Sequence, residues 1–187
     1  PTALTGFVGR EGELREVKRL LATTHLLTLT GAGGCGKTRL SLQVAADLLD
    51  TFPGGVWFVE LAALTDPTTV PSALATAMGL REDPSKPLLT SIGEKLRNKI
   101  SLLILDNCEH LVAACAEATD RLLRACPNLR IMASSREALG IAGETVWRVP
   151  SLPESEAIRL FCDRAIAVAP GFAMTEQNAA PLAQISP

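Results

Sequence analysis

Short apolar, β-branched runs alternate with helical patterns along most of the chain, and this alternation constrains the fold most strongly. The five candidate strands are residues 26–30, 56–59, 102–105, 129–133 and 145–149. Apolar residues at helical spacing follow the first strand at Leu40 and Val44, and the third at Leu111 and Cys115. Strands that alternate with helices pair in parallel, and near-continuous apolar strands suit a sheet covered on both faces. We therefore expect an α/β fold with a doubly wound parallel sheet.

A glycine-rich loop, G-A-G-G-C-G-K-T at residues 31–38, stands between the first strand and the first long helix. Two nucleotide-binding motifs overlap in it. As G-x-G-x-x-G it is a dinucleotide fingerprint, with Glu60 after the second strand as a candidate ribose ligand. As G-x-x-x-x-G-K-T it is a phosphate-binding P-loop, and a glycine turn without any ligand is the third alternative.

Lys37 favours the P-loop. In that motif the backbone N–H groups surround the phosphates and the lysine contributes a point charge on their terminal oxygens. The hydroxyl of Thr38 then becomes a ligand for Mg²⁺. The dinucleotide motif gives neither residue a task. The candidate nucleotide-binding residues of the loop are Gly31, Ala32, Gly33, Gly34, Cys35, Gly36, Lys37, Thr38 and Arg39.

Asp106 ends the third strand and is the candidate second Mg²⁺ ligand and catalytic acid of the site. A carboxylate at the end of a buried strand is costly unless it is paired or bound to a metal. Parallel strands also place their carboxyl ends at the edge where ligands bind. The alternative is that Asp106 caps the following helix, because aspartate is a preferred N-cap residue.

Arg136 follows the fourth strand and has two interpretations of equal weight on the residues alone. Ser134 and Glu137 have capping-box spacing, so the segment would start a helical turn with Arg136 in solvent. Otherwise the guanidinium lies at the same sheet edge as the phosphates and senses the terminal one.

Composition narrows the function further. The chain has 187 residues with 18 Lys and Arg against 20 Asp and Glu, so its net charge of −2 gives no electrostatic drive toward nucleic acid. Its five cysteines form no C-x-x-C pair, which argues against a zinc cluster, and His25 and His110 are expected at the surface. With no apolar run of membrane-spanning length, we expect a soluble, cytoplasmic protein that does not bind membranes.

Prolines mark the expected boundaries. The segment 80–87 is expected to connect two helices. Pro150 and Pro153 mark a second break, followed by an amphipathic helix over residues 154–168. The sequence therefore predicts a nucleotide-binding domain over residues 1–150 and part of a helical domain over residues 151–187.

Four segments jointly resemble the signal-transduction ATPases with numerous domains (STAND), and most closely the NB-ARC-type ATPase module of large bacterial LuxR-type transcriptional regulators. These segments are residues 7–11, 31–40, 102–111 and 133–143. The resemblance implies a five-stranded sheet of order 5-1-4-3-2 and a small helical domain that begins near Pro153. It also implies an ATP/ADP-binding switch that uses Mg²⁺, with self-association, and with DNA contacted only through another domain.

The same resemblance implies roles for individual residues. Val8, Gly9 and Arg10 would lie against the adenine, and Lys37 and Thr38 would hold phosphate and Mg²⁺. Asp106 would be the Walker B acid, and Arg136 the sensor arginine. The candidate catalytic residues are therefore Lys37, Asp106 and Arg136.

Two departures from the family pattern bear on activity. Asn107 stands where a second acid often follows the Walker B acid, which predicts slow hydrolysis with Glu109 as a weak substitute base. The chain also ends before the family's Gly-Leu-Pro-Leu motif and winged helix, so we expect a fragment with a partly open site. The alternatives are an ATPase or small-molecule kinase with true turnover, and an NAD(P)-binding oxidoreductase domain.

Overall fold

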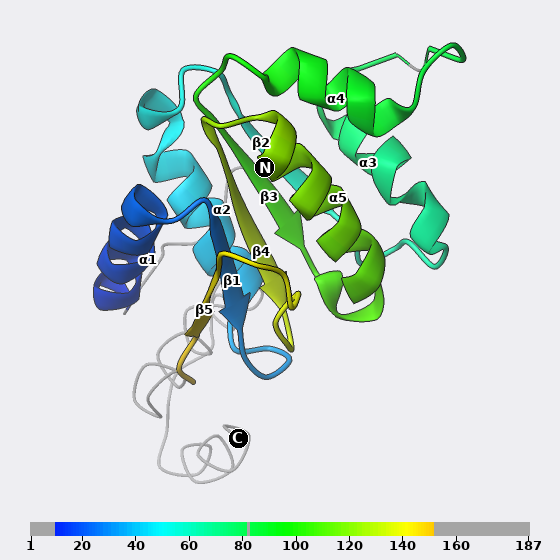
Figure 1. Ribbon diagram of the computed structural model, residues 1–187. Coiled ribbons are helices and arrows are strands. Elements are labelled where there is room, and N and C mark those ends of the chain that lie inside the picture. Colours follow the sequence, from blue (N-terminus) through cyan, green and yellow to red (C-terminus); the bar gives the residue numbers. More distant parts are fainter. Residues whose placement is uncertain (1–9, 82, 152–187) are drawn as a thin grey trace, which may run out of the picture. The chain divides into compact units, whose positions relative to one another are not determined.

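The computed structural model describes residues 10–81 and 83–151 (Figure 1). Contacts divide the described chain into two units, a large one over Glu13–Val149 and a small one that takes in residues 10–12 and 150–151. The glycine loop and all five strands belong to the large unit. The helix expected over residues 154–168 lies outside the described residues, so the domain boundary after residue 150 stays a prediction.

Five parallel strands form one sheet in the order β2-β3-β4-β1-β5, which confirms the expected doubly wound α/β fold with strand order 5-1-4-3-2. The strands are β1 Leu26–Thr30, β2 Val56–Glu60, β3 Ser101–Asp106, β4 Leu129–Ser135 and β5 Glu144–Arg148. The helices are α1 Glu11–Thr23, α2 Lys37–Asp47, α3 Val70–Ala77, α4 Leu88–Leu96 and α5 Val112–Ala125. Short 3₁₀ turns, η1 Leu49–Thr51, η2 Pro67–Thr69 and η3 Cys108–His110, complete the described elements.

Helices cover both faces of the sheet (Figure 1). On one face α2 packs against β2, β3 and β4, and on the other α3, α4 and α5 pack against one another and against β2 and β4. Alternate residues of each strand face opposite sides. Leu103 and Leu105 of β3 therefore join the core cluster with α3, α4 and α5, while Leu102 and Ile104 are buried outside that cluster. Asp106 is an even number of residues from Leu102 and Ile104, so its side chain faces the same side of the sheet as theirs.

Pairing extends β4 beyond its apolar run. The sequence predicts this strand over residues 129–133, but it continues to Ser135 because Ser134 and Ser135 pair with Leu29 and Thr30 of β1. The strand expected over residues 145–149 instead spans Glu144–Arg148, since Glu144 pairs with Leu26 and the pairing with β1 ends at Arg148. The segment 80–87 connects α3 to α4 as expected. None of the helices within residues 10–81 and 83–151 is long and apolar enough to cross a membrane.

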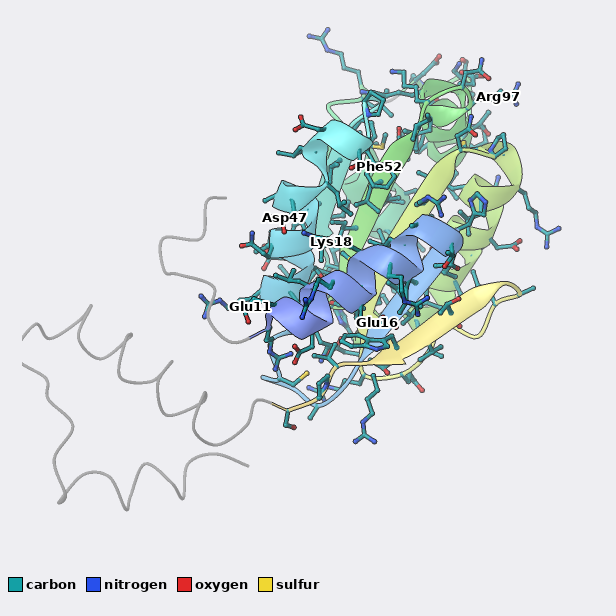
Figure 2. The ribbon with its side chains drawn as sticks, turned by 90° about the vertical axis from the view of Figure 1, so that its left-hand side faces the viewer. Glu11, Glu16, Lys18, Asp47, Phe52 and Arg97 are labelled. Atoms are coloured by element: carbon teal, nitrogen blue, oxygen red, sulfur yellow. The ribbon has the colours of Figure 1, made fainter. Side chains whose placement is uncertain are left out.

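An ion pair joins α1 to α2. Lys18 of α1 points toward Asp47 of α2 (Figure 2), and its ammonium donates to the Asp47 carboxylate. The hydrogen bond from Lys18, with a further one from Gln43, holds the pKa of Asp47 below its usual value against the opposing effect of burial. A depressed folded-state pKa stabilises the fold above the unfolded pKa, and this stability is lost as the pH falls through the folded pKa.

We expect Asp47→Asn to lower the free energy of unfolding by only about 0.5 kcal/mol at pH 7, because both partners are partly exposed. The difference from wild type should shrink as the pH falls from about 5 to about 2. Urea unfolding at pH 7 and at acid pH measures it, with Asp50→Asn in η1 as the matched control. A loss that stays constant across this pH range would contradict the assignment.

Candidate functional site

Glycine conformation shapes the loop that joins β1 to α2. Gly34 and Gly36 have φ angles of 80° and 90°, the left-handed region that glycine adopts without strain. Gly36 directly precedes α2. At Gly31, an added Cβ would lie 2.9 Å from Cys35 Sγ and 3.2 Å from the Val149 carbonyl oxygen. The tight course of the loop thus requires glycine at these three positions.

Lys37 is the first residue of α2, and its side chain turns back onto the loop. Its Nζ donates to the carbonyl oxygens of Gly31 at 2.9 Å and Ala32 at 3.0 Å, and the residue is only 7% exposed. A desolvated ammonium group beside a helix N-terminus gives a local concentration of positive charge. This part of the loop is therefore suited to an anion.

Asp106 meets two hydroxyl donors at the carboxyl ends of the strands. Thr38 Oγ1 lies 3.1 Å from Asp106 Oδ1 and 2.8 Å from Oδ2, and Ser134 Oγ donates to Oδ1. Asp106 is 2% exposed, so these donors offset the cost of burying the carboxylate. Because side chains alternate along β3, Asp106 faces the side of the sheet that α2 covers, and Thr38 of α2 can therefore contact it. Asp106 is not a helix cap, because the residue before η3 is Asn107.

Asn107 turns the chain out of β3. Its φ of 69° is left-handed, and it is the one non-glycine residue with a positive φ in the described ranges. Asparagine tolerates this conformation better than most residues. Its backbone N–H donates to Ser134 Oγ at 3.0 Å, which links the turn to β4. The turn is thus fixed next to the buried carboxylate.

The turn η3 is fixed at its other end by His110. Nε2 of His110 lies 3.1 Å from the carbonyl oxygen of Leu61 and 2.8 Å from that of Leu64. Because carbonyl oxygens only accept, Nε2 carries the proton. The imidazole therefore ties η3 to the segment that follows β2, and both histidines are exposed as expected.

Arg136 lies beside the glycine loop and pairs with Glu109 of η3. Its Nε is 3.3 Å from Glu109 Oε1. A methyl group added at Gly33 would lie 3.8 Å from Arg136 Nη2, so the guanidinium also adjoins the loop. The capping-box interpretation is wrong, because no helix begins at this end of β4 in the described chain. Instead the hydroxyl of Ser134 binds Asp106, and the backbone N–H of Glu137 donates to Ser135 Oγ.

The donors around Thr38 and Asp106 fit a magnesium ion. Mg²⁺ prefers oxygen ligands and is commonly held by one or two protein groups together with phosphate oxygens and waters. A hydroxyl and a buried carboxylate in mutual contact offer such a pair. No group of three or more His, Cys, Asp or Glu side chains suited to a metal occurs in the described residues. A metal at this position would therefore depend on a bound phosphate for its remaining ligands.

The remaining predicted site residues are Val8, Gly9, Arg10 and Arg39. Arg10 Nη2 donates to the carbonyl oxygen of Pro150 at 3.1 Å within the small unit. Val8 and Gly9 lie outside the described residues, so an adenine contact by residues 8–10 stays a prediction. Arg39 lies on α2, one residue beyond Thr38.

The strand order contradicts the dinucleotide alternative. In that fold the second strand neighbours the first, which brings its terminal acid to the glycine loop. Here β1 lies between β4 and β5, and β2 forms the far edge of the sheet. Glu60 at the end of β2 is therefore separated from β1 by β3 and β4.

Two buried thiols, Cys108 in η3 and Cys126 at the end of α5, have raised pKa values. The hydrogen bond with Cys115, together with burial, raises the pKa of Cys108 far above its usual range. Burial also raises the pKa of Cys126. Such thiols stay protonated and are poor nucleophiles. Cys35 lies in the loop itself and is partly exposed.

Sequence comparisons find similar proteins in bacteria. A family model described as an AAA domain matches residues 20–142. An uncharacterised protein of Mycobacterium tuberculosis is 44% identical over 97% of this chain, which covers 47% of that protein. A Mycobacterium tuberculosis protein named as a candidate HTH-type transcriptional regulator is 45% identical over 90% of this chain, which covers 19% of it. The chain thus spans about half the length, or less, of these curated relatives.

Solved structures share the fold. A Cdc6p of Pyrobaculum aerophilum matches 87% of this chain and 50% of its own length with a TM-score of 0.66 at 18% identity. A STAND protein with a tetratricopeptide repeat sensor from Pyrococcus horikoshii matches 99% of this chain and 28% of its own, with a TM-score of 0.61 at 18% identity. At such identities the likeness concerns the fold alone. With the glycine loop, the buried acid at the end of β3 and the match over residues 20–142, the chain belongs to the AAA domain family of P-loop ATPases.

Proposed function

We propose that this protein binds ATP and ADP together with Mg²⁺ and acts as a nucleotide-dependent switch within a multidomain transcriptional regulator, with slow ATP hydrolysis. The contact of Thr38 with the buried Asp106, directly beside Lys37, carries this proposal. It unites the three groups that a P-loop site needs: a phosphate-binding ammonium, a hydroxyl ligand and a carboxylate.

Each residue has a defined task in the proposed site. The backbone N–H groups of residues 31–36 and the N-terminus of α2 bind the phosphates. Lys37 exchanges its bonds to the loop carbonyls for bonds to the terminal phosphate oxygens. Thr38 and Asp106 would hold Mg²⁺, which when bound would offset part of the phosphate charge. Ser134 keeps one oxygen of Asp106 oriented.

Slow hydrolysis follows from the residues after Asp106. A general base must lie within hydrogen-bond reach of the attacking water. Asn107 has no carboxylate, and its backbone is held in a left-handed turn. Glu109 is the next acid along the chain, and Arg136 engages one of its oxygens. The bound nucleotide therefore persists long enough to act as a signal.

The regulatory setting is inferred from relatives. One of them, 45% identical, is named as a candidate HTH-type transcriptional regulator, and this chain covers 19% of it. The net charge of −2 gives this chain no electrostatic drive toward DNA, so the regulator would contact DNA through another domain. The regulator would have two arrangements that differ in self-association and output, and exchange of ADP for ATP in the site would shift the equilibrium between them.

Steady-state phosphate release tests the switch against a fast ATPase or a small-molecule kinase. We expect turnover of ATP with Mg²⁺ well below 1 s⁻¹, the lower end of the usual enzyme range of about 1–10³ s⁻¹. Asp106→Asn should abolish the residual rate, and Asp120→Asn on α5 should leave it unchanged. A rate of tens per second, or one that rises strongly with a small-molecule acceptor, would favour an enzyme with true turnover.

A further inference from the structure

The ion pair of Glu109 and Arg136 has one fixed partner and one accessible partner. The Glu109 side chain is 17% exposed, whereas that of Arg136 is 69% exposed. Glu109 belongs to η3, which the Asn107–Ser134 and His110 hydrogen bonds fasten on both sides. Any rearrangement of the pair is therefore a movement of the Arg136 side chain.

The pair leaves both side chains incompletely bonded. The Arg136–Glu109 contact is through Nε at 3.3 Å, whereas guanidinium has five N–H donors and binds carboxylate or phosphate best through two of them. The second oxygen of Glu109, Oε2, is buried and has no hydrogen-bond donor among the residues that the structure describes. Such a pair is weaker than a bidentate one, so a second anion can compete for Arg136.

The glycine loop is where that second anion would be. Arg136 Nη2 adjoins Gly33, because a Cβ added there would lie 3.8 Å from it, while Nε of the same guanidinium contacts Glu109. Phosphate on the loop and the Glu109 carboxylate thus lie within reach of one guanidinium. A terminal phosphate carries more charge than a carboxylate and attracts arginine more strongly.

We propose that Glu109 is an internal competitor for Arg136 and sets how strongly the site discriminates a nucleoside triphosphate from a diphosphate. This inference rests on the proposed nucleotide site. Without a terminal phosphate Arg136 stays on Glu109, and with one it turns to the phosphate and leaves Glu109. The competition therefore weakens triphosphate binding and leaves diphosphate binding unchanged.

Calorimetric titration with the non-hydrolysable ATP analogue AMP-PNP and with ADP, both with Mg²⁺, tests this inference. Glu109→Gln keeps the side-chain shape and removes the charge. We expect it to tighten AMP-PNP binding about three- to five-fold, the size of one partly exposed ion pair, and to leave ADP binding unchanged. Arg136→Ala should weaken AMP-PNP binding about tenfold, and adding Glu109→Gln to it should have no further effect.

The matched control is Glu117→Gln, which removes a more exposed carboxylate that also pairs with an arginine, Arg121 on α5. It should change neither affinity. Should Glu109→Gln unfold the protein, Glu109→Asp, whose carboxylate is drawn back from Arg136, should tighten AMP-PNP binding in the same direction. Weaker or unchanged AMP-PNP binding, an equal change for ADP, or an effect that survives in Arg136→Ala would overturn the inference. If wild type bound neither nucleotide, the proposed function would fail, and the inference with it.

Discussion

Replacing Lys37 by alanine is expected to weaken ATP binding by about a hundredfold while leaving the fold intact. A hundredfold change corresponds to about 2.8 kcal/mol, which lies within the range of about 1.5–3 kcal/mol that one hydrogen bond to a charged group contributes. The ammonium lies on the loop carbonyls of Gly31 and Ala32, so it is already positioned where the phosphates would bind. Titration calorimetry with ATP and Mg²⁺ measures the loss.

Lys99→Ala is the matched control for this experiment. Lys99 is exposed and precedes β3, at the end of the sheet opposite Asp106. It should keep wild-type affinity. Thermal unfolding of both variants separates a binding defect from a folding defect, and Lys37→Met preserves most of the packing of the stem if alanine proves destabilising. Equal affinities for wild type and Lys37→Ala would contradict the phosphate-binding role.

Asp106→Asn is expected to remove the dependence of nucleotide binding on Mg²⁺. The amide is nearly the same shape as the carboxylate but has no charge and only one oxygen to offer a metal. Thr38 Oγ1 contacts both carboxylate oxygens, so the substitution also replaces one acceptor by a donor facing a hydroxyl. We expect affinity for ATP with Mg²⁺ to fall about tenfold or more, toward the value measured in EDTA.

Asp120→Asn supplies a control for this second prediction. Asp120 is a partly exposed carboxylate on α5, and the hydrogen bond from Arg124 holds the pKa of Asp120 below its usual value. We expect the ratio of the ATP affinity in Mg²⁺ to the ATP affinity in EDTA to be the same for this control as for wild type. If Asp106→Asn also kept the wild-type ratio, Asp106 would have no part in metal binding.

The sheet could be predicted largely from local patterns. The runs 26–30 and 102–105 are apolar enough to require burial on both faces, and the crossover helices then force parallel pairing. The order of the strands came from the resemblance of four segments to a known family, because crossover patterns alone fit more than one order. The predicted strands do not include residues 134, 135 and 144. These residues join the strands because they pair with β1, which is distant in the sequence.

Much of the candidate site was also accessible to sequence reasoning, but its connections were not. Lys37, Thr38 and Asp106 are identified by motif and by position at strand ends. The role of Ser134 was missed, although parity places it on the same face as Asp106 once β3 and β4 are neighbours. The partner of Arg136 was also missed, since Glu109 lies 27 positions earlier on a turn whose geometry depends on the left-handed Asn107.

Titration of the wild-type protein with ATP, in Mg²⁺ and then in EDTA, tests the central claim most directly. A site formed by Lys37, Thr38 and Asp106 should bind one ATP per chain, with an affinity that falls about tenfold or more when Mg²⁺ is removed. NAD⁺ in the same cell should give no heat of binding. No ATP binding, or an affinity that does not change with Mg²⁺, would contradict the account.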